Sequence, residues 1–104
     1  MRAVWDALDD AGADLVLSGH DHDYERFAPL GKDGQPSADG MRQFVVGTGG
    51  KSHYPALFGK PGSQVRNSST YGVLNLTLNS DGFAWRFVPV EGSSFKDAGS
   101  VKCR

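Results

Sequence analysis

The feature that most constrains the fold of this chain is a pair of alternating apolar runs in its C-terminal third. Leucine occupies every second position of residues 74–78, which is the period of a β-strand with one buried face. The sequence Asn-Ser-Asp-Gly at 79–82 is typical of a tight turn, with Gly82 expected in the left-handed conformation. Aromatic side chains then alternate on the returning run, at Phe83, Trp85 and Phe87. The pattern predicts an antiparallel hairpin over 71–90. Its aromatic stripe is more typical of a core than of a platform that stacks bases or sugars.

The N-terminal segment predicts a helix followed by a strand. Val4, Leu8 and Ala11 recur at helical spacing, so we expect an amphipathic helix over 2–11 that ends at Gly12. Residues 13–18 then form a short apolar run, which is typical of a strand covered on both faces. Helix, turn and strand make half of an α/β unit, in which ligands gather at the carboxyl ends of strands.

The remaining segments are less regular. Residues 27–40 are rich in Gly, Pro, Asp and Ser and predict a surface excursion, and residues 41–47 predict one strand. Residues 51–70 have no clear period and predict a long irregular loop. We therefore expect a single partial domain over 1–104. Its expected parts are a helix, strand and metal loop (1–26), a loop-rich part with one strand (27–70), the hairpin (71–90) and a tail (91–104).

Two histidines stand directly after the first predicted strand. His20 and His22 are separated by one residue, and neutral imidazole is the commonest protein ligand for transition metals. Alternate side chains of an extended segment lie side by side on one face. This spacing suits two ions about 3.5–4 Å apart better than it suits one ion.

A family resemblance is carried by residues 19–26, Gly-His-Asp-His-Asp-Tyr-Glu-Arg. The first four residues resemble the closing Gly-His-x-His motif of the calcineurin-like metallophosphoesterases, and the Tyr-Glu-Arg extension resembles the purple acid phosphatase branch. Residues 42–50 and the hairpin resemble the segments that follow this motif. The resemblance implies an α/β fold, the C-terminal portion of a metallophosphoesterase β-sandwich. In that portion helices flank a mixed sheet that ends in an antiparallel hairpin.

The resemblance also implies a function and its cofactors. The family hydrolyses phosphoric esters with two bridged divalent or trivalent ions (Fe, Zn or Mn), which activate a water molecule and stabilise the phosphoryl group. His20 would ligate one ion and His22 the other, and both would be catalytic. The family's other ligand motifs, an Asp-x-His, a Gly-Asp-x-x-Asp, a Gly-Asn-His and a further His, have no match here. We therefore expect this chain by itself to hold one ion or none.

The residues after the histidines are candidates for support of the site. Asp23 or Glu25 could accept the second ring N–H of a ligand histidine and so fix its tautomer. Tyr24 and Arg26 would hold the loop by packing and ion pairing. In an alternative interpretation, Arg26 contacts phosphate in a bidentate manner.

Two further places are candidates for a substrate loop. At Gly49 and Gly50, backbone amides could approach a phosphate, although a plain tight turn explains the pattern equally well. In the next segment, His53 or Lys51 could contact a phosphate oxygen or donate a proton, and the alternative is an exposed loop histidine.

The composition of the chain limits the classes of binding partner that we expect. The 104 residues carry a formal net charge of −1 with scattered basic residues, which gives no basis for a nucleic-acid or membrane partner. No apolar stretch approaches the roughly 18 residues of a membrane span, and the first residues do not form a signal peptide. We expect a soluble chain whose parent could be secreted. Cys103 is expected to be a free thiol in a frayed tail or, in the family context, to pair with a cysteine elsewhere.

Two other interpretations remain beside the hydrolase. The chain could be a catalytically inactive fragment that keeps part of the fold. It could also be a self-associating module, in which two copies pair through an exposed sheet edge and share their histidine pairs around metal.

Overall fold

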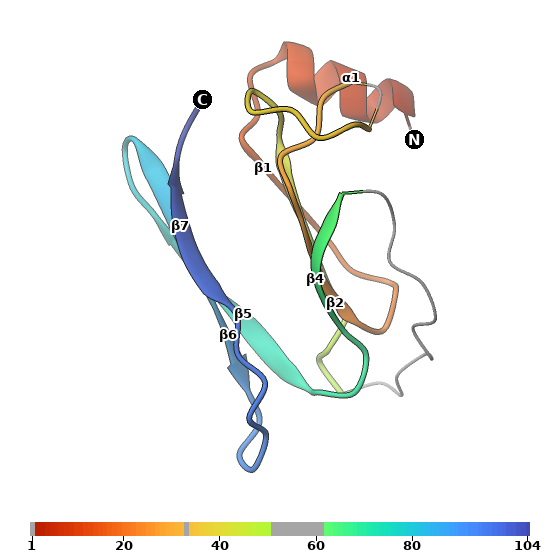
Figure 1. Cartoon of the computed structure of the whole chain (residues 1–104), viewed down its shortest axis with the longest axis vertical. Helices are drawn as coiled ribbons and strands as arrows, with labels where there is room; N and C mark the ends of the chain where they lie inside the picture. The colour runs from red at the N-terminus through yellow and green to blue at the C-terminus, as the bar shows by residue number, and fades with distance from the viewer. Residues whose placement is uncertain (1, 33, 51–61) are drawn as a thin grey trace.

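The computed structural model describes residues 2–32, 34–50 and 62–104. Over these ranges the chain is mostly β, with one short helix and two sheets (Figure 1). No helix in the described ranges is long and apolar enough to cross a bilayer. The elements are α1 (Arg2–Asp10), β1 (Leu15–Ser18), β2 (Tyr24–Phe27), β3 (Arg42–Val46), β4 (Ser63–Asn67), β5 (Gly72–Leu78), β6 (Gly82–Pro89) and β7 (Ala98–Lys102).

The first sheet is mixed, as expected, and has the strand order β1-β3-β2-β4, but the hairpin that was expected to end it belongs to a separate sheet. With one helix and two sheets, the expected α/β class fits only coarsely. β1 runs parallel to β3, and β2 runs antiparallel to both β3 and β4. Tyr24, at the start of β2, pairs with Val46 at the end of β3 and with Asn67 at the end of β4. The carboxyl ends of β1, β3 and β4 therefore meet the start of β2 at one edge of the sheet, here called the rim.

The second sheet confirms the predicted hairpin. β5 and β6 pair antiparallel from Gly72–Pro89 to Leu78–Phe83, and β7 adds a third antiparallel strand. The prediction for Gly82 was wrong, because its φ is not positive and it is the first residue of β6. A Cβ at Gly82 would lie 2.4 Å from the carbonyl oxygen of Val101. Glycine is required there by the close approach of β7 rather than by the turn.

The core lies between the two sheets, which face each other in Figure 1. The aromatic stripe of β6 is buried there, as predicted. Ring contacts cross between the sheets: Phe44 meets Trp85 edge-on at 5.3 Å between centroids, and Tyr24 lies 4.8 Å from Phe87. The buried cluster consists of Tyr24, Phe44, Phe83, Trp85 and Phe87.

Helix α1 ends where the sequence predicts. Gly12 has a φ of 84°, and its N–H donates to the Asp9 carbonyl while the Ala13 N–H donates to that of Leu8, each at 3.1 Å. This is the Schellman arrangement. The face of α1 that carries the regularly spaced apolar residues is not buried, however, because Val4 is 53% exposed and Leu8 is exposed as well.

Trp5 is the residue that anchors α1 to the first sheet. Its ring packs against a second small core, made by Phe27, Leu30 and Val45, and its indole N–H donates to the Gly31 carbonyl at 3.0 Å. A tryptophan buries more area than valine or leucine and needs a partner for its N–H. Its contacts therefore set the rotation of the helix.

Four expectations are corrected by strand pairing. Residues 24–26, expected within the metal loop, form β2 together with Phe27, and β4 lies inside the predicted loop 51–70, so the part 27–70 holds more than one strand. β1 is an edge strand among the described residues, and Leu17 is 53% exposed rather than covered on both faces. β7 lies in the predicted tail 91–104. These strands have short or weakly apolar sequences, so pairing with a neighbour rather than local pattern decides them.

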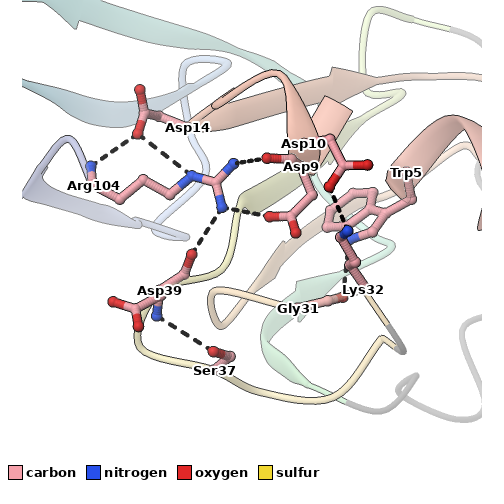
Figure 2. A network of polar contacts seen from close by, with 9 residues as sticks. All are labelled: Trp5, Asp9, Asp10, Asp14, Gly31, Lys32, Ser37, Asp39 and Arg104. Atoms are coloured by element: carbon pink, nitrogen blue, oxygen red, sulfur yellow. Dashed lines mark hydrogen bonds and ion pairs between the residues drawn. The ribbon is translucent and has the colours of Figure 1, made fainter. Parts of the chain in front are cut away.

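The last residues are held in place by the N-terminal half (Figure 2). The Arg104 backbone N–H donates to Asp14 Oδ1 at 2.9 Å, and its guanidinium bonds to the Asp39 carbonyl at 2.8 Å and to the Asp9 carboxylate. In the same region Lys32 pairs with Asp10. Cys103 is a free, exposed thiol on this anchored segment, so the expected fraying is wrong.

Replacing Phe44 by alanine tests the two-sheet core. Phe44 is fully buried between the sheets, so Phe44→Ala should lower the free energy of unfolding by about 3–5 kcal/mol. Val73→Ala is the matched control, because Val73 is 60% exposed and should change the free energy by less than about 0.5 kcal/mol. Urea unfolding followed by tryptophan fluorescence measures both. Equal losses in the two variants would contradict this core.

Candidate functional site

The predicted metal ligands lie on a tight loop at the rim, residues 19–23, here called the histidine loop. It joins the end of β1 to the start of β2. The Asp21 N–H donates to the Gly19 carbonyl and the Asp23 N–H to the Asp21 carbonyl, both at 2.9 Å. These are successive three-residue turns. They place both imidazoles at the edge where the carboxyl ends of three strands meet.

His20 has a strained backbone. Its φ is 75°, and within the described ranges it is the only residue other than glycine with a positive φ. The left-handed conformation costs an L-residue roughly 1–2 kcal/mol, and such strain clusters at functional sites. The His20 side chain is 94% exposed, and its Nδ1 lies 3.8 Å from Asp21 Oδ1. The strain therefore presents an imidazole to solvent at the rim.

Gly47 makes the histidine loop possible. Its N–H donates to the Asp23 carbonyl at 2.8 Å. A Cβ at this position would lie 1.8 Å from the Asp21 carbonyl oxygen. Only glycine lets the end of β3 pass so close to the loop backbone. Sequence reasoning missed this role, although Gly47 stands at the end of a predicted strand.

Asp23 and Glu25, which follow the histidines in sequence, are buried. Burial raises the pKa of Asp23, and the charge of Glu25 raises it further, while Arg66, with its Nε at 3.4 Å, acts in the opposite direction. Within the described part of the chain, Asp23 Oδ1 and Glu25 Oε2 are buried without a hydrogen-bond partner. Both carboxylates thus keep acceptor capacity one and three residues after His22, which is half-buried. The predicted hydrogen bond from a histidine ring stays a prediction.

The side chains of Tyr24 and Arg26 lie on the face of β2 that Glu25 does not share, between the two sheets. The Tyr24 hydroxyl donates to Asp97 Oδ2 at 2.5 Å, and Arg26 donates to the same carboxylate from Nε at 2.8 Å and Nη2 at 3.1 Å. Arg26 Nη1 donates to Gln64 Oε1 at 2.5 Å. Burial and the hydrogen bond to Asp97 raise the pKa of Tyr24. These contacts have the form of the predicted packing and ion pairing, and Asp97 gave no signal in the sequence.

The turn after β3 is tied to the second sheet. The buried Thr48 hydroxyl donates to the Gly72 carbonyl at 2.9 Å, and the Gly72 N–H donates back to the Thr48 carbonyl at 3.0 Å. Gly50 has a φ of 130°, in keeping with a glycine turn, and a Cβ added at Gly49 would meet nothing within 4 Å. Lys51 and His53 lie outside the described residues. The approach of these amides to phosphate stays a prediction.

A cavity of about 460 Å³ opens beside the histidine loop, between β1 and β5. Its walls are mainly apolar and include Leu17, Val46 and Leu74. Apolar walls do not neutralise a phosphate. The charged candidates of the site therefore lie on the loop rather than in this cavity.

The donors fit a metal centre in kind and fall short in number. Imidazole and carboxylate are ligands of zinc, iron and manganese. In the described part of the chain, no group of three or more His, Cys, Asp or Glu side chains is placed to hold a metal ion. A catalytic zinc usually has about three protein ligands. The described residues therefore provide only part of such a site.

Comparison of the chain with protein-family models, with curated proteins and with solved structures gave no match. The functional argument therefore rests on the geometry of the histidine loop and on the resemblance of its motif.

Substituting Gly47 tests the contact under the loop. Gly47→Ala should displace the loop and cost more than about 1 kcal/mol of unfolding free energy, because the new methyl group meets backbone. Gly49→Ala is the matched control, with nothing within 4 Å and an expected change within about 0.5 kcal/mol. Amide NMR shifts of residues 19–23 and urea unfolding provide the measurements. Unmoved loop resonances in Gly47→Ala would refute the contact.

Because of the Asp97 carboxylate, we expect the free energy of unfolding to depend on pH in the acid range. Burial by itself raises the pKa of Asp97, but hydrogen bonds from Arg26 and Tyr24 outweigh it, so the folded pKa is lowered. The carboxylate then stabilises the fold above its unfolded pKa of about 3.9, and this contribution is lost as the pH falls through the folded pKa. Asp97→Asn should flatten the acid limb of the stability profile, whereas Asp81→Asn, on an exposed turn, should preserve it. If the stability of Asp97→Asn falls with decreasing pH as steeply as that of the parent protein, the assignment is contradicted.

Proposed function

We propose that this chain contributes His20 and His22 to a two-metal site that hydrolyses phosphoric esters, as in the metallophosphoesterases that its motif resembles. The observation that carries the proposal is the strained His20 backbone. It lies on a loop that is held by the close contact and hydrogen bond of Gly47, the residue after β3. Such strain persists only where the surrounding structure enforces it, and it is found mainly at functional sites.

The position of the loop supports the same function. Ligands of α/β sheets collect at the carboxyl ends of strands, and the histidine loop lies where β1, β3 and β4 all end. His20 offers an exposed imidazole to one ion, and His22 is the candidate ligand of the other. The metals, when bound, supply Lewis acidity and an activated water.

The buried carboxylates fit a supporting role in this site. Asp23 and Glu25 each have an oxygen without a hydrogen-bond partner in the described ranges, and both lie within three residues of His22. A carboxylate that accepts the second N–H of a ligand imidazole orients the ring and raises its basicity. The remaining metal ligands, and the groups that select a substrate, come from outside the described residues.

A second candidate function is a metal-binding module assembled from two copies. The observation that favours it is the position of β1, which is an edge strand of the described sheet and carries a half-exposed Leu17. An unpaired strand edge is a template for pairing with another chain. Pairing of two such edges would supply further imidazoles without any additional segment.

Metal content, turnover and mass in solution separate these functions. Purified protein is loaded with zinc, manganese or iron, freed of excess metal and analysed, and then assayed with bis(p-nitrophenyl) phosphate. Metal with turnover supports the hydrolase, and metal in a dimer without turnover supports the module. Metal in a monomer without turnover supports ligation by the histidines at an incomplete site. Protein that binds no metal is the inactive fragment, and this result would overturn the proposal.

Histidine variants test the two ligands individually. His20→Gly is the sharpest change, because glycine accepts a φ of 75° and should preserve or slightly increase stability while it removes the imidazole. We expect His20→Gly and His22→Ala each to lower metal affinity by at least about 10-fold, the lower bound for loss of an outer-shell partner. Arg86→Ala, on the exposed face of β6, is the control. Unchanged metal affinity in both histidine variants would refute the assignment.

A further inference from the structure

We infer that Asp97 is a positioning residue for the histidine loop and acts on it through Tyr24; this inference rests on the proposed function. Asp97 lies 75 residues beyond His22 in sequence, on the segment between β6 and β7. Its side chain is buried, and its carbonyl accepts the Phe87 N–H at 2.8 Å. The second sheet therefore fixes the place of this carboxylate.

The carboxylate reaches the strand that begins directly after the loop. One oxygen accepts the Tyr24 hydroxyl at 2.5 Å and the Arg26 Nε at 2.8 Å, and the other accepts Arg26 Nη2 at 3.1 Å. Charge-assisted and bidentate hydrogen bonds are stronger and more directional than neutral ones. Asp97 thereby fixes the first and third residues of β2.

Tyr24 transmits this restraint to the loop. Its ring is held by Phe87 and Phe95, at 4.8 and 5.7 Å between centroids, so the ring cannot turn freely. The next residue toward the loop is Asp23, whose carbonyl accepts the Gly47 N–H at 2.8 Å. A shift of Tyr24 would therefore displace Asp23, at the end of the loop, relative to the Gly47 N–H that it accepts.

The chemistry of the contact argues for orientation. A buried ion pair gains little net stability over apolar residues of the same volume, because both charges lose their hydration. The aromatic cluster around Tyr24 already supplies apolar area at this place. The carboxylate adds a fixed direction for the Tyr24 hydroxyl, which phenylalanine in place of tyrosine could not use.

The test compares loop geometry in protein without metal. Asp97→Asn and Tyr24→Phe are the test variants, and Val101→Ala is the matched control, because it trims the same core from β7. Each protein is studied at a temperature where its own unfolding curve shows it to be folded. NMR then records the imidazole resonances of His20 and His22 and the amide resonances of residues 19–23. We expect both test variants to shift these resonances and Val101→Ala to leave them in place.

A zinc titration supplies the second readout. Asp97→Asn and Tyr24→Phe should weaken zinc binding by about 10–100-fold, the range for residues that orient metal ligands, while Val101→Ala binds like the parent protein. If Asp97→Asn does not fold, Tyr24→Phe decides alone, because it removes one hydroxyl and keeps the ion pair. Loop resonances that coincide with those of the parent in Tyr24→Phe would overturn the inference. If the parent binds no zinc, the proposed function fails, and the resonances still decide whether Asp97 positions the loop.

Discussion

The contact on which the rest of the structure depends is the carboxylate of Asp97 between the two sheets. Apolar burial holds the sheets together without direction, since the hydrophobic effect follows area. The bonds from Tyr24 and Arg26 give the interface a direction and a register. Beside them, the guanidinium groups of Arg26 and Arg42 lie 5.3 and 5.1 Å from the ring centroid of Trp85. A buried guanidinium, Arg42, and a partly buried one, Arg26, thus share one aromatic ring, and Arg26 also binds the Asp97 carboxylate.

This interface explains how a strained loop can persist at the rim. A positive φ at His20 costs roughly 1–2 kcal/mol, which is a large share of the stability of a small domain. The loop is held at one end by β1 and at the other by Tyr24. In addition, the Gly47 N–H donates to the carbonyl of Asp23. Because these restraints come from both sheets, the strained conformation is maintained by the whole domain. The proposed metal-binding role would use the imidazole that this conformation exposes.

Local pattern predicted the parts of the fold that short-range forces decide. Alternating leucines and aromatics predicted the hairpin, and Gly12 predicted the end of the helix, because side-chain period and backbone φ are local properties. The pattern gave the wrong face for α1, since the indole of Trp5 has a partner at Gly31 that no helical period contains. β4 and β7 were missed for a related reason. Each has few apolar residues and becomes a strand only when a neighbour pairs with it.

For the candidate site, the sequence by itself determined the two imidazoles, their spacing and their place after a strand. Only the tertiary structure decided that β1, β3 and β4 end together at that place and that Gly47 supports the loop. It also decided that Asp97 holds Tyr24, and that α1 leaves Val4 and Leu8 exposed. The physical reason is separation along the chain. Donor type, turn chemistry and side-chain period are written in neighbouring residues, whereas a hydrogen bond across 73 positions depends on how the sheets pack.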